Sequence, residues 1–453
     1  MKSLADLDPT WAWDPFVPTP EQPWNRSWAA HLHRRAGFGA STRVLDETLK
    51  LAPSDAVQSL MNRSVTTAEQ QASDSLARSS IAGGKPEPLS AWWLHQLLTT
   101  SDPLREKLTL FWHGHFATGA DKVTDPELMY AQNKLFRSQA TGNFRELTQS
   151  IARDPAMLIY LDSATNRKLH PNENFARELM ELFCLGEGNY TERDIRELAR
   201  CFTGWEIRRG KYRFNKYQND AGSKTFLGET GQFSGEQGID IVLKQSSCPR
   251  FVTKKLIHYY LFDEPDIPES LVNPLAESFA SDWAIAPLVQ RILSSNLFFS
   301  AYSFGRKVRS PVDFSIGLMH GLEMSTNVIE LTQELGNLGQ RLFFPPNVKA
   351  WDGGRSWINS STLLGRANLV KRLLNHKKSR FNGGSLSDLL SKHKANSPQL
   401  IVSWLVDTLF AVHPPQSVQH DVVALIETPE GDRETRLREA VRLLCTQPEF
   451  HLG

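Results

Sequence analysis

The sequence predicts a mainly α-helical protein, a single large multi-helix domain that carries a small inserted β-hairpin and long loops rich in Pro, Gly and Trp. Within residues 104–115, Leu, Leu, Phe and His recur at i, i+4, i+7 and i+11, the spacing of one helical face. Thr191 and Asp194 resemble a capping box at the start of a second apolar stripe. Further helices are expected at 251–262, 285–299, 311–323, 398–412 and 433–446.

Composition narrows the class of protein. The 453 residues include 51 Lys and Arg against 50 Asp and Glu, a net charge of +1 that makes nucleic acid an unlikely partner. No run of about 18 apolar residues is present, so we expect no membrane partner. The first residues lack the apolar segment of a secretory signal, and we expect a cytoplasmic protein. The four cysteines are scattered without a metal-binding spacing, which favours free thiols.

The chain divides into four segments by composition. Residues 1–27 are rich in Pro and Trp without a helical period and predict an extended arm whose tryptophans dock on the body. Residues 28–63 predict an N-terminal helical unit. Residues 64–89 are polar and small and predict a loop or linker. Residues 90–453 form the main helical body.

A hairpin is expected at about 207–230. Residues 211–214 alternate charged and aromatic side chains, the period of a strand. Residues 224–228 would pair with them across a turn at 219–222. The cations and aromatics of 208–217 could hold a phosphorylated ligand or a nucleic-acid strand, but a charged hairpin face is the simpler interpretation.

Two histidines, His113 and His115, flank Gly114 at the end of a predicted helix. Side chains at i and i+2 lie about 200° apart on a helix, so the helix would have to end there for the rings to converge. Neutral imidazoles that converge suit zinc, iron or copper. The alternative is one hydrogen-bonded core histidine and one surface histidine.

The helix expected from Pro171 carries a charged pattern. Glu173, Arg177 and Glu181 lie four residues apart and predict a salt-bridge ladder, whereas Glu178 and Glu181 share another face. Two carboxylates on one stripe could bind a cation or act as acid and base. The alternative is a solvated, salt-bridged helix face. The loop 343–359, with its paired Pro, Gly and Trp residues, could wall a pocket or plug the fold.

Long motifs make the chain resemble a known family. They are HLHRRAGFGAS at 31–41, LTLFWHGHFATG at 108–119, NENFARELMELFCLG at 172–186, YTERDIRELARCFTGW at 190–205, KTFLG at 224–228 and FPPNVKAWDGGRSWINSSTLLGRAN at 344–368. With these motifs the sequence resembles the bacterial family catalogued as domain of unknown function 1800. The resemblance implies a protein partner, because members are often encoded beside a second family with a phosphatase- or sulfatase-like look.

The resemblance also marks two departures. The family usually has a His where this chain has Phe183, and His-Asp where it has Asn219-Asp220. Both departures remove an imidazole from segments that flank the predicted site. The resemblance therefore implies a reduced or different site in this chain.

Two functions follow as hypotheses. The first is a metal-dependent hydrolase or oxidoreductase with a divalent transition metal between helices. The second is a non-catalytic binding or assembly module whose His, Glu and Arg residues form a buried network. The small-molecule substrate is not predicted. The catalytic candidates are Glu178, Arg177, Lys224 and Asp220, and the metal-ligand candidates are His113, His115, Glu173 and Glu181.

Overall fold

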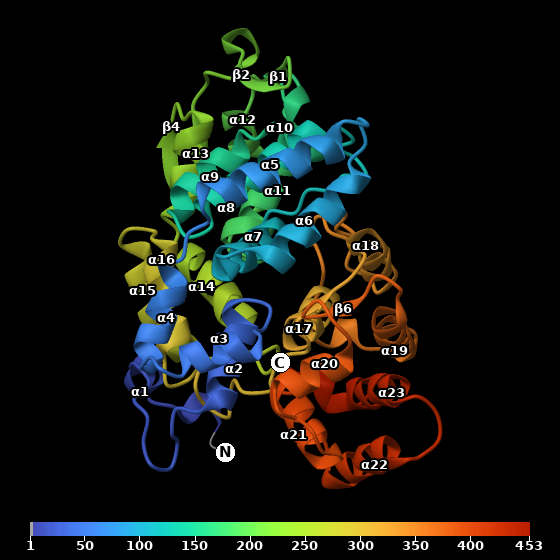
Figure 1. Cartoon of the computed structure of the whole chain (residues 1–453). Helices are drawn as coiled ribbons and strands as arrows, with labels where there is room; N and C mark the ends of the chain where they lie inside the picture. Colours follow the sequence, from blue (N-terminus) through green and yellow to red (C-terminus); the bar gives the residue numbers. More distant parts are fainter. Residues whose placement is uncertain (1–2) are drawn as a thin grey trace.

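The computed structural model describes residues 3–453, and these residues form 23 α-helices and three two-stranded sheets (Figure 1). This confirms the mainly α-helical prediction. The N-terminal third contains α1 (Pro9–Trp13), α2 (Arg26–Ala36), α3 (Thr42–Thr48), α4 (Pro53–Met61), α5 (Thr67–Ile81), α6 (Glu87–Thr99), α7 (Pro103–His115), α8 (Pro126–Gln139), α9 (Phe144–Ala152) and α10 (Pro155–Tyr160).

The middle of the chain contains the four strands β1–β4, each of which is longer than the two-residue strands β5 and β6. It forms α11 (Asn174–Glu178), a π-helix (Leu179–Cys184), α12 (Glu192–Cys201), β1 (Trp205–Arg208), β2 (Lys211–Phe214), β3 (Lys224–Phe226), β4 (Glu229–Gly231), α13 (Gly235–Leu243), α14 (Ser247–Tyr260), α15 (Glu269–Ala280) and α16 (Ile285–Ser294). The C-terminal third forms α17 (Pro311–Gly321), β5 (Met324–Ser325), α18 (Val328–Asn337), α19 (Ser360–Asn375), β6 (Arg380–Phe381), α20 (Leu386–Lys392), α21 (Pro398–Leu409), α22 (Gln416–Glu427) and α23 (Arg433–Cys445).

Two large hydrophobic cores organise these helices. The first is built from residues between 4 and 299, and the second joins α5 and α6 to the helices that follow residue 311. Helix α7 contributes to both cores, with Leu108 in the first and Leu110 in the second. Arg35, Lys107 and Arg309 are buried at the junction between the two cores, where the site described below lies.

The N-terminal arm docks on the body, as its tryptophans predict, but it is not extended throughout. Asp8 caps α1 by accepting a hydrogen bond from the Thr10 amide. The Trp13 ring is buried and its Nε1 donates to the Leu271 carbonyl at 2.7 Å. Asp8 and Pro9 are helix-start signals, but the lack of an apolar period in 1–27 led to the prediction of an extended arm.

The prediction of a loop or linker at 64–89 is wrong, because most of it is α5. Thr66 and Glu69 form a reciprocal capping box at its start. Ala77 and Ile81 are buried against the second core, and Ser73 hydrogen-bonds Gln96 of α6. A low apolar content hid this helix, although Ala, Glu, Gln, Leu and Arg all have high helix propensity.

The predicted hairpin is two hairpins with a different register. Strand β1 pairs with β2 and β3 pairs with β4, so residues 211–214 do not pair with 224–228. Each pair is joined by a two-residue turn, at 209–210 and 227–228, whose residues all have positive φ. That backbone is the one two-residue hairpin turns require, with Gly in second place. The Asn219–Gly222 segment instead connects the hairpins.

Two further expectations concern cysteines and membranes. All four cysteines are free and buried, as their spacing predicts. Among the helices formed by residues 3–453, none has the length and apolar character needed to cross a membrane.

The buried arm tryptophan provides a test of the docking. We expect Trp13→Ala to destabilise the protein by about 3–5 kcal/mol, because it removes a buried ring and its hydrogen bond. Trp11→Ala, two residues away at a side chain that is 41% exposed, is the matched control and should be nearly neutral. Melting temperatures of both variants measure the difference. Equal melting temperatures would contradict a docked arm.

Candidate anion-binding site

The two histidines of the predicted metal site face different surroundings. Helix α7 continues through His115, so the rings at 113 and 115 do not converge. His113 is buried with its ring against those of Trp93, Phe343 and Trp351, and its Nε2 has no hydrogen-bond partner in the described chain. Burial lowers the pKa of His113 to about 3, so the ring is neutral at pH 7.

Both ring nitrogens of His115 are engaged. Nε2 donates to the Phe183 carbonyl at 2.9 Å, which leaves Nδ1 as the acceptor facing Lys255 Nζ at 3.3 Å. Lys255 Nζ also donates to the Leu182 carbonyl. Burial lowers the pKa of Lys255 to about 8. His115 therefore anchors the π-helix to α7 and α14, and ligation of a metal would break these contacts.

The carboxylate helix is shorter than predicted and becomes a π-helix after Glu178. Helix α11 begins at Asn174 rather than Pro171, because the Asn172 side chain accepts the Asn174 amide in a local turn. Arg177 pairs with Glu173 at 3.3 Å and with Glu192 at 2.7 Å, which confirms the first step of the predicted ladder. These side chains are partly exposed and do not form a buried network.

Glu178 and Glu181 are close enough to affect each other. Burial, and then the charge of Glu181, raise the pKa of Glu178. Glu181 accepts from the Tyr190 hydroxyl at 3.1 Å, and Lys349 Nζ lies 4.0 Å from it. The two carboxylates thus lie close together, as predicted.

Asp220 and Lys224 stabilise the loop between the two hairpins. Asp220 pairs with Arg200 at 2.7 Å, and Lys224 Nζ donates to the carbonyls of Asp220 and Gly222. Neither touches His113 or His115, which are enclosed by other residues. Across residues 3–453, no three His, Cys, Asp or Glu side chains are grouped so that they could hold a metal ion. The eight predicted site residues are therefore not assembled into one centre.

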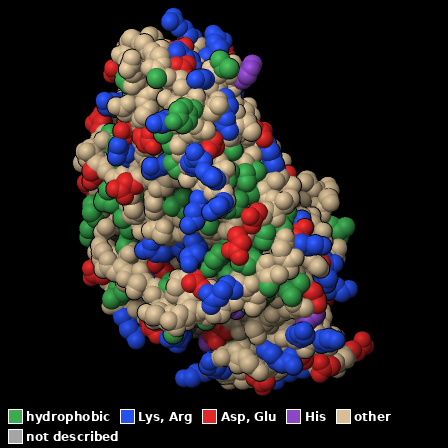
Figure 2. Space-filling model, turned by 90° about the horizontal axis from the view of Figure 1, so that it is seen from above, with side chains coloured by type: hydrophobic (Ala, Val, Ile, Leu, Met, Phe, Trp, Pro, Cys, Tyr) green, Lys and Arg blue, Asp and Glu red, His purple; other side chains and the backbone are tan. Residues whose placement is uncertain are grey.

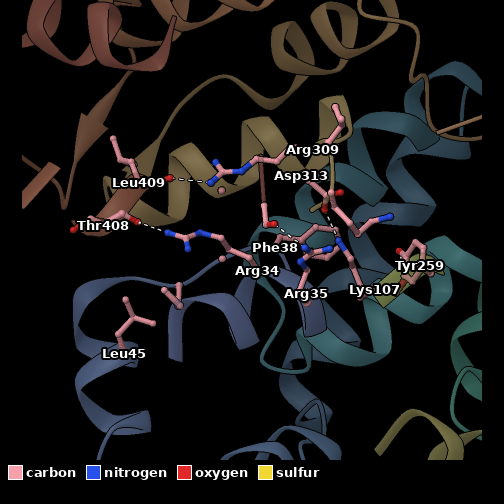
Figure 3. A pocket seen from close by; sticks show the side chains of 17 residues that line it. Arg34, Arg35, Phe38, Leu45, Lys107, Tyr259, Arg309, Asp313, Thr408 and Leu409 are labelled. Carbon is pink, nitrogen blue, oxygen red and sulfur yellow. Dashed lines mark hydrogen bonds and ion pairs between the residues drawn. The ribbon is translucent and has the colours of Figure 1, made fainter. Parts of the chain in front are cut away.

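A different group of side chains converges at the junction of the two cores. It lines a small cavity of about 60 Å³, which we call the cationic chamber. At roughly 10–15 Å³ per water, it accommodates several waters or the end group of a small molecule. Figure 3 shows Arg34 extending from α2 toward Thr408, whereas Arg35 lies beside Lys107 and Asp313. Its charged lining residues are Arg34, Arg35, Lys107, Lys307, Arg309 and Asp313.

Each arginine of the chamber bonds backbone carbonyls from a distant segment. Arg34 Nη2 donates to the Phe410 carbonyl at 2.7 Å, and Arg35 Nη2 donates to Ser303 and Gly453 at 2.7 Å each. Arg309 Nη2 donates to the Leu409 carbonyl at 2.9 Å. These bonds fix the guanidinium groups in place, so the chamber is pre-organised.

Several donors remain unused. Arg34 Nη1 and both Nε and Nη1 of Arg35 are buried without a hydrogen-bond partner in the described chain. Buried donors that lack partners are costly, and they indicate a group or solvent that the protein itself does not supply.

The chamber has an excess of positive charge. Lys107 pairs with Asp313 and Lys307 with Asp263, and among residues 3–453 the other three of the five cations have no side-chain carboxylate partner. Even if the Gly453 oxygen that accepts from Arg35 carried a negative charge, it would balance only one of these three cations. Burial lowers the pKa of Arg35 to about 9, opposed by Asp263 and Asp313. Burial and the charges of Arg309 and Arg35 lower the pKa of Arg34.

A larger cleft adjoins the chamber. Its volume is about 750 Å³, within the range of about 300–1,000 Å³ typical of small-molecule sites. Tyr259, Lys307 and Asp313 line both spaces, so the two are adjacent. Residues 349–355 and 357 form one wall, which favours the pocket wall over the plug as the role of loop 343–359, and Trp351 and Trp357 line the cleft together with Phe111 and Tyr259.

Sequence reasoning missed the chamber. Its residues are dispersed over α2, α7, the segment before α17 and α17 itself. One signal was available: Lys107 lies three residues after Leu104 and four before Phe111, on the apolar stripe of its helix. A cation on a buried stripe needs a partner or a ligand. Arg34 and Arg35 gave no comparable signal.

Fold and site together define a mainly α-helical protein with a cationic chamber at the end of an aromatic-walled cleft. A family model described as protein of unknown function (DUF1800) matches residues 31–452, so the chain belongs to this family. No curated protein and no solved structure matches the chain.

A comparison of two arginines tests whether the ion pairs of Arg177 on α11 form a buried network that stabilises the protein. Arg177 is partly exposed, and exposed ion pairs contribute about 0–1 kcal/mol. Arg137 pairs with Glu106, whose side chain is only 1% exposed, and breaking a buried pair costs about 3–5 kcal/mol. We expect Arg177→Ala to leave the melting temperature nearly unchanged and Arg137→Ala to lower it clearly. A large loss at Arg177 would restore the buried-network hypothesis.

Proposed function

We propose that the protein binds a small molecule through an oxyanion, a carboxylate or phosphate group, held in the cationic chamber. The observation that carries this proposal is the set of buried, unpartnered nitrogens of Arg34 and Arg35. An oxyanion would accept from these donors and neutralise the excess charge. Guanidinium groups suit this role because their donors match the geometry of carboxylate and phosphate oxygens.

The cleft is suited to the rest of the ligand. Its aromatic side chains offer apolar contact area, and its cations are balanced by carboxylates such as Asp263 and Asp352. A ligand with one anionic end and a largely uncharged body would match both spaces. This ligand binding develops the binding-module hypothesis, with the chamber rather than the His, Glu and Arg cluster as its centre.

A metal-dependent activity has less support. The predicted ligands are apart, and His115 already uses both ring nitrogens. The protein partner from a neighbouring gene and the cytoplasmic location stay predictions.

Phosphate tests the chamber directly. We expect the melting temperature to rise with phosphate concentration relative to chloride at equal ionic strength, because a ligand that binds only the folded state stabilises it, by about 2.7 kcal/mol at 100 times Kd. Arg34→Gln should remove most of this increase, because it removes a charge and one of the unpartnered donors of the chamber. Isothermal titration calorimetry with phosphate and acetate gives the affinities.

Arg43→Gln is the matched control, since it removes the same charge from an exposed side chain nearby. Phosphate also stabilises proteins non-specifically, so the contrast between these two variants decides the outcome. If Arg34→Gln does not fold, Lys307→Gln provides the same comparison from the other side of the chamber. An equal phosphate response in the chamber variant and the control would refute the proposal.

A further inference from the structure

The β1–β2 hairpin lies at one end of the molecule, remote from the cationic chamber (Figure 1). The segment before α11 packs beside it, because the Lys168 amide donates to the Gln218 carbonyl at 2.9 Å and Arg167 pairs with Glu206 of β1. We call this end the hairpin tip, residues 167–170 together with 208–217.

The hairpin tip is strongly basic. Within the chain from residue 3 onward, its exposed cations Lys168, Arg208, Arg209, Lys211 and Lys216 have no carboxylate partner. The nearby carboxylate of Glu206 is already shared by Arg167 and Arg213. The whole chain has a net charge of only +1, so this excess is local and is hidden by the average.

Apolar side chains are exposed among these cations. Leu169 is 78% exposed, Tyr217 73% and Phe214 49%. Figure 2, which views the molecule from above, shows Lys and Arg side chains over this face interspersed with hydrophobic side chains and with Asp and Glu. Apolar groups interleaved with cations fit an anionic surface that has an apolar layer beneath it.

We propose that the hairpin tip docks on the surface of an anionic phospholipid membrane. The cations would lie against the headgroups, and Leu169, Phe214 and Tyr217 would enter the boundary below them. A projecting tip suits a planar surface, whereas a nucleic-acid strand is usually held in a groove that tracks its backbone. An exposed leucine also has no stacking role toward bases. Peripheral docking needs no spanning helix, so it is compatible with the absence of one among the described helices.

Vesicle co-sedimentation of the full-length protein tests this proposal. We expect binding to vesicles of phosphatidylglycerol and phosphatidylcholine, and none to phosphatidylcholine alone. The triple variant Lys168→Gln/Arg208→Gln/Lys211→Gln should lose at least about tenfold in affinity, because each cation near an anionic membrane adds to the attraction. The matched control is Lys85→Gln/Lys377→Gln/Lys378→Gln, which removes three exposed cations located elsewhere.

A second variant separates the apolar contribution from the charge. Leu169→Ser/Tyr217→Ser should weaken the binding that survives in 0.5 M salt, where exposed charges are screened. No binding to anionic vesicles by the wild type, or equal binding by the two triple variants, would overturn the proposal. Retention of a single-stranded oligonucleotide without vesicle binding would also overturn it and assign the tip to nucleic acid.

Discussion

Where the two hydrophobic cores meet, guanidinium groups hydrogen-bond to backbone carbonyls of segments distant in the sequence. Arg34 and Arg35 leave α2 and bond carbonyls at residues 410, 303 and 453, and Arg309 bonds the carbonyl of Leu409. Carbonyl acceptors satisfy the hydrogen-bonding of a guanidinium group only in part and do not neutralise its charge. The junction is thus held by cations whose charge is only partly compensated, and the same groups provide the unpartnered donors on which the proposed anion binding rests.

These two roles are compatible because different nitrogens perform them. Nη2 of Arg34 and of Arg35 donates to the carbonyls, whereas Nη1 of both residues is buried and has no hydrogen-bond partner in the part of the chain that the structure describes. A purely structural arginine would be expected to use its remaining donors on other backbone groups. Here only one side of each guanidinium group donates to the backbone, and donors on the other side stay unused. Pre-organised donors of this kind reduce the cost of ordering a ligand site.

The sequence predicted the helices much better than the site. Helix periodicity and capping at Thr191 are local, and the structure confirms them. The helix at 67–81 was missed because its burial depends on α6, and the hairpins were mispaired because Arg209 and Leu227 gave no sign of positive φ. His113 and His115 were paired by proximity in sequence, although a continuous helix separates their rings. The chamber joins residues some 270 positions apart, such as Arg35 and Ser303, and no local pattern encodes such a contact.

The family departures can be interpreted from this geometry. Phe183 packs its ring near that of His115 and offers it a backbone carbonyl, and Asn219 donates to the Thr203 carbonyl. Both positions therefore perform packing and loop-holding roles that do not need an imidazole. Neither residue lines the cationic chamber or the adjoining cleft. The motifs at 31–41, 108–119 and 344–368, by contrast, all contribute residues to those two spaces. Loss of two histidines would alter the surroundings of the π-helix while leaving the lining of the cationic chamber unchanged.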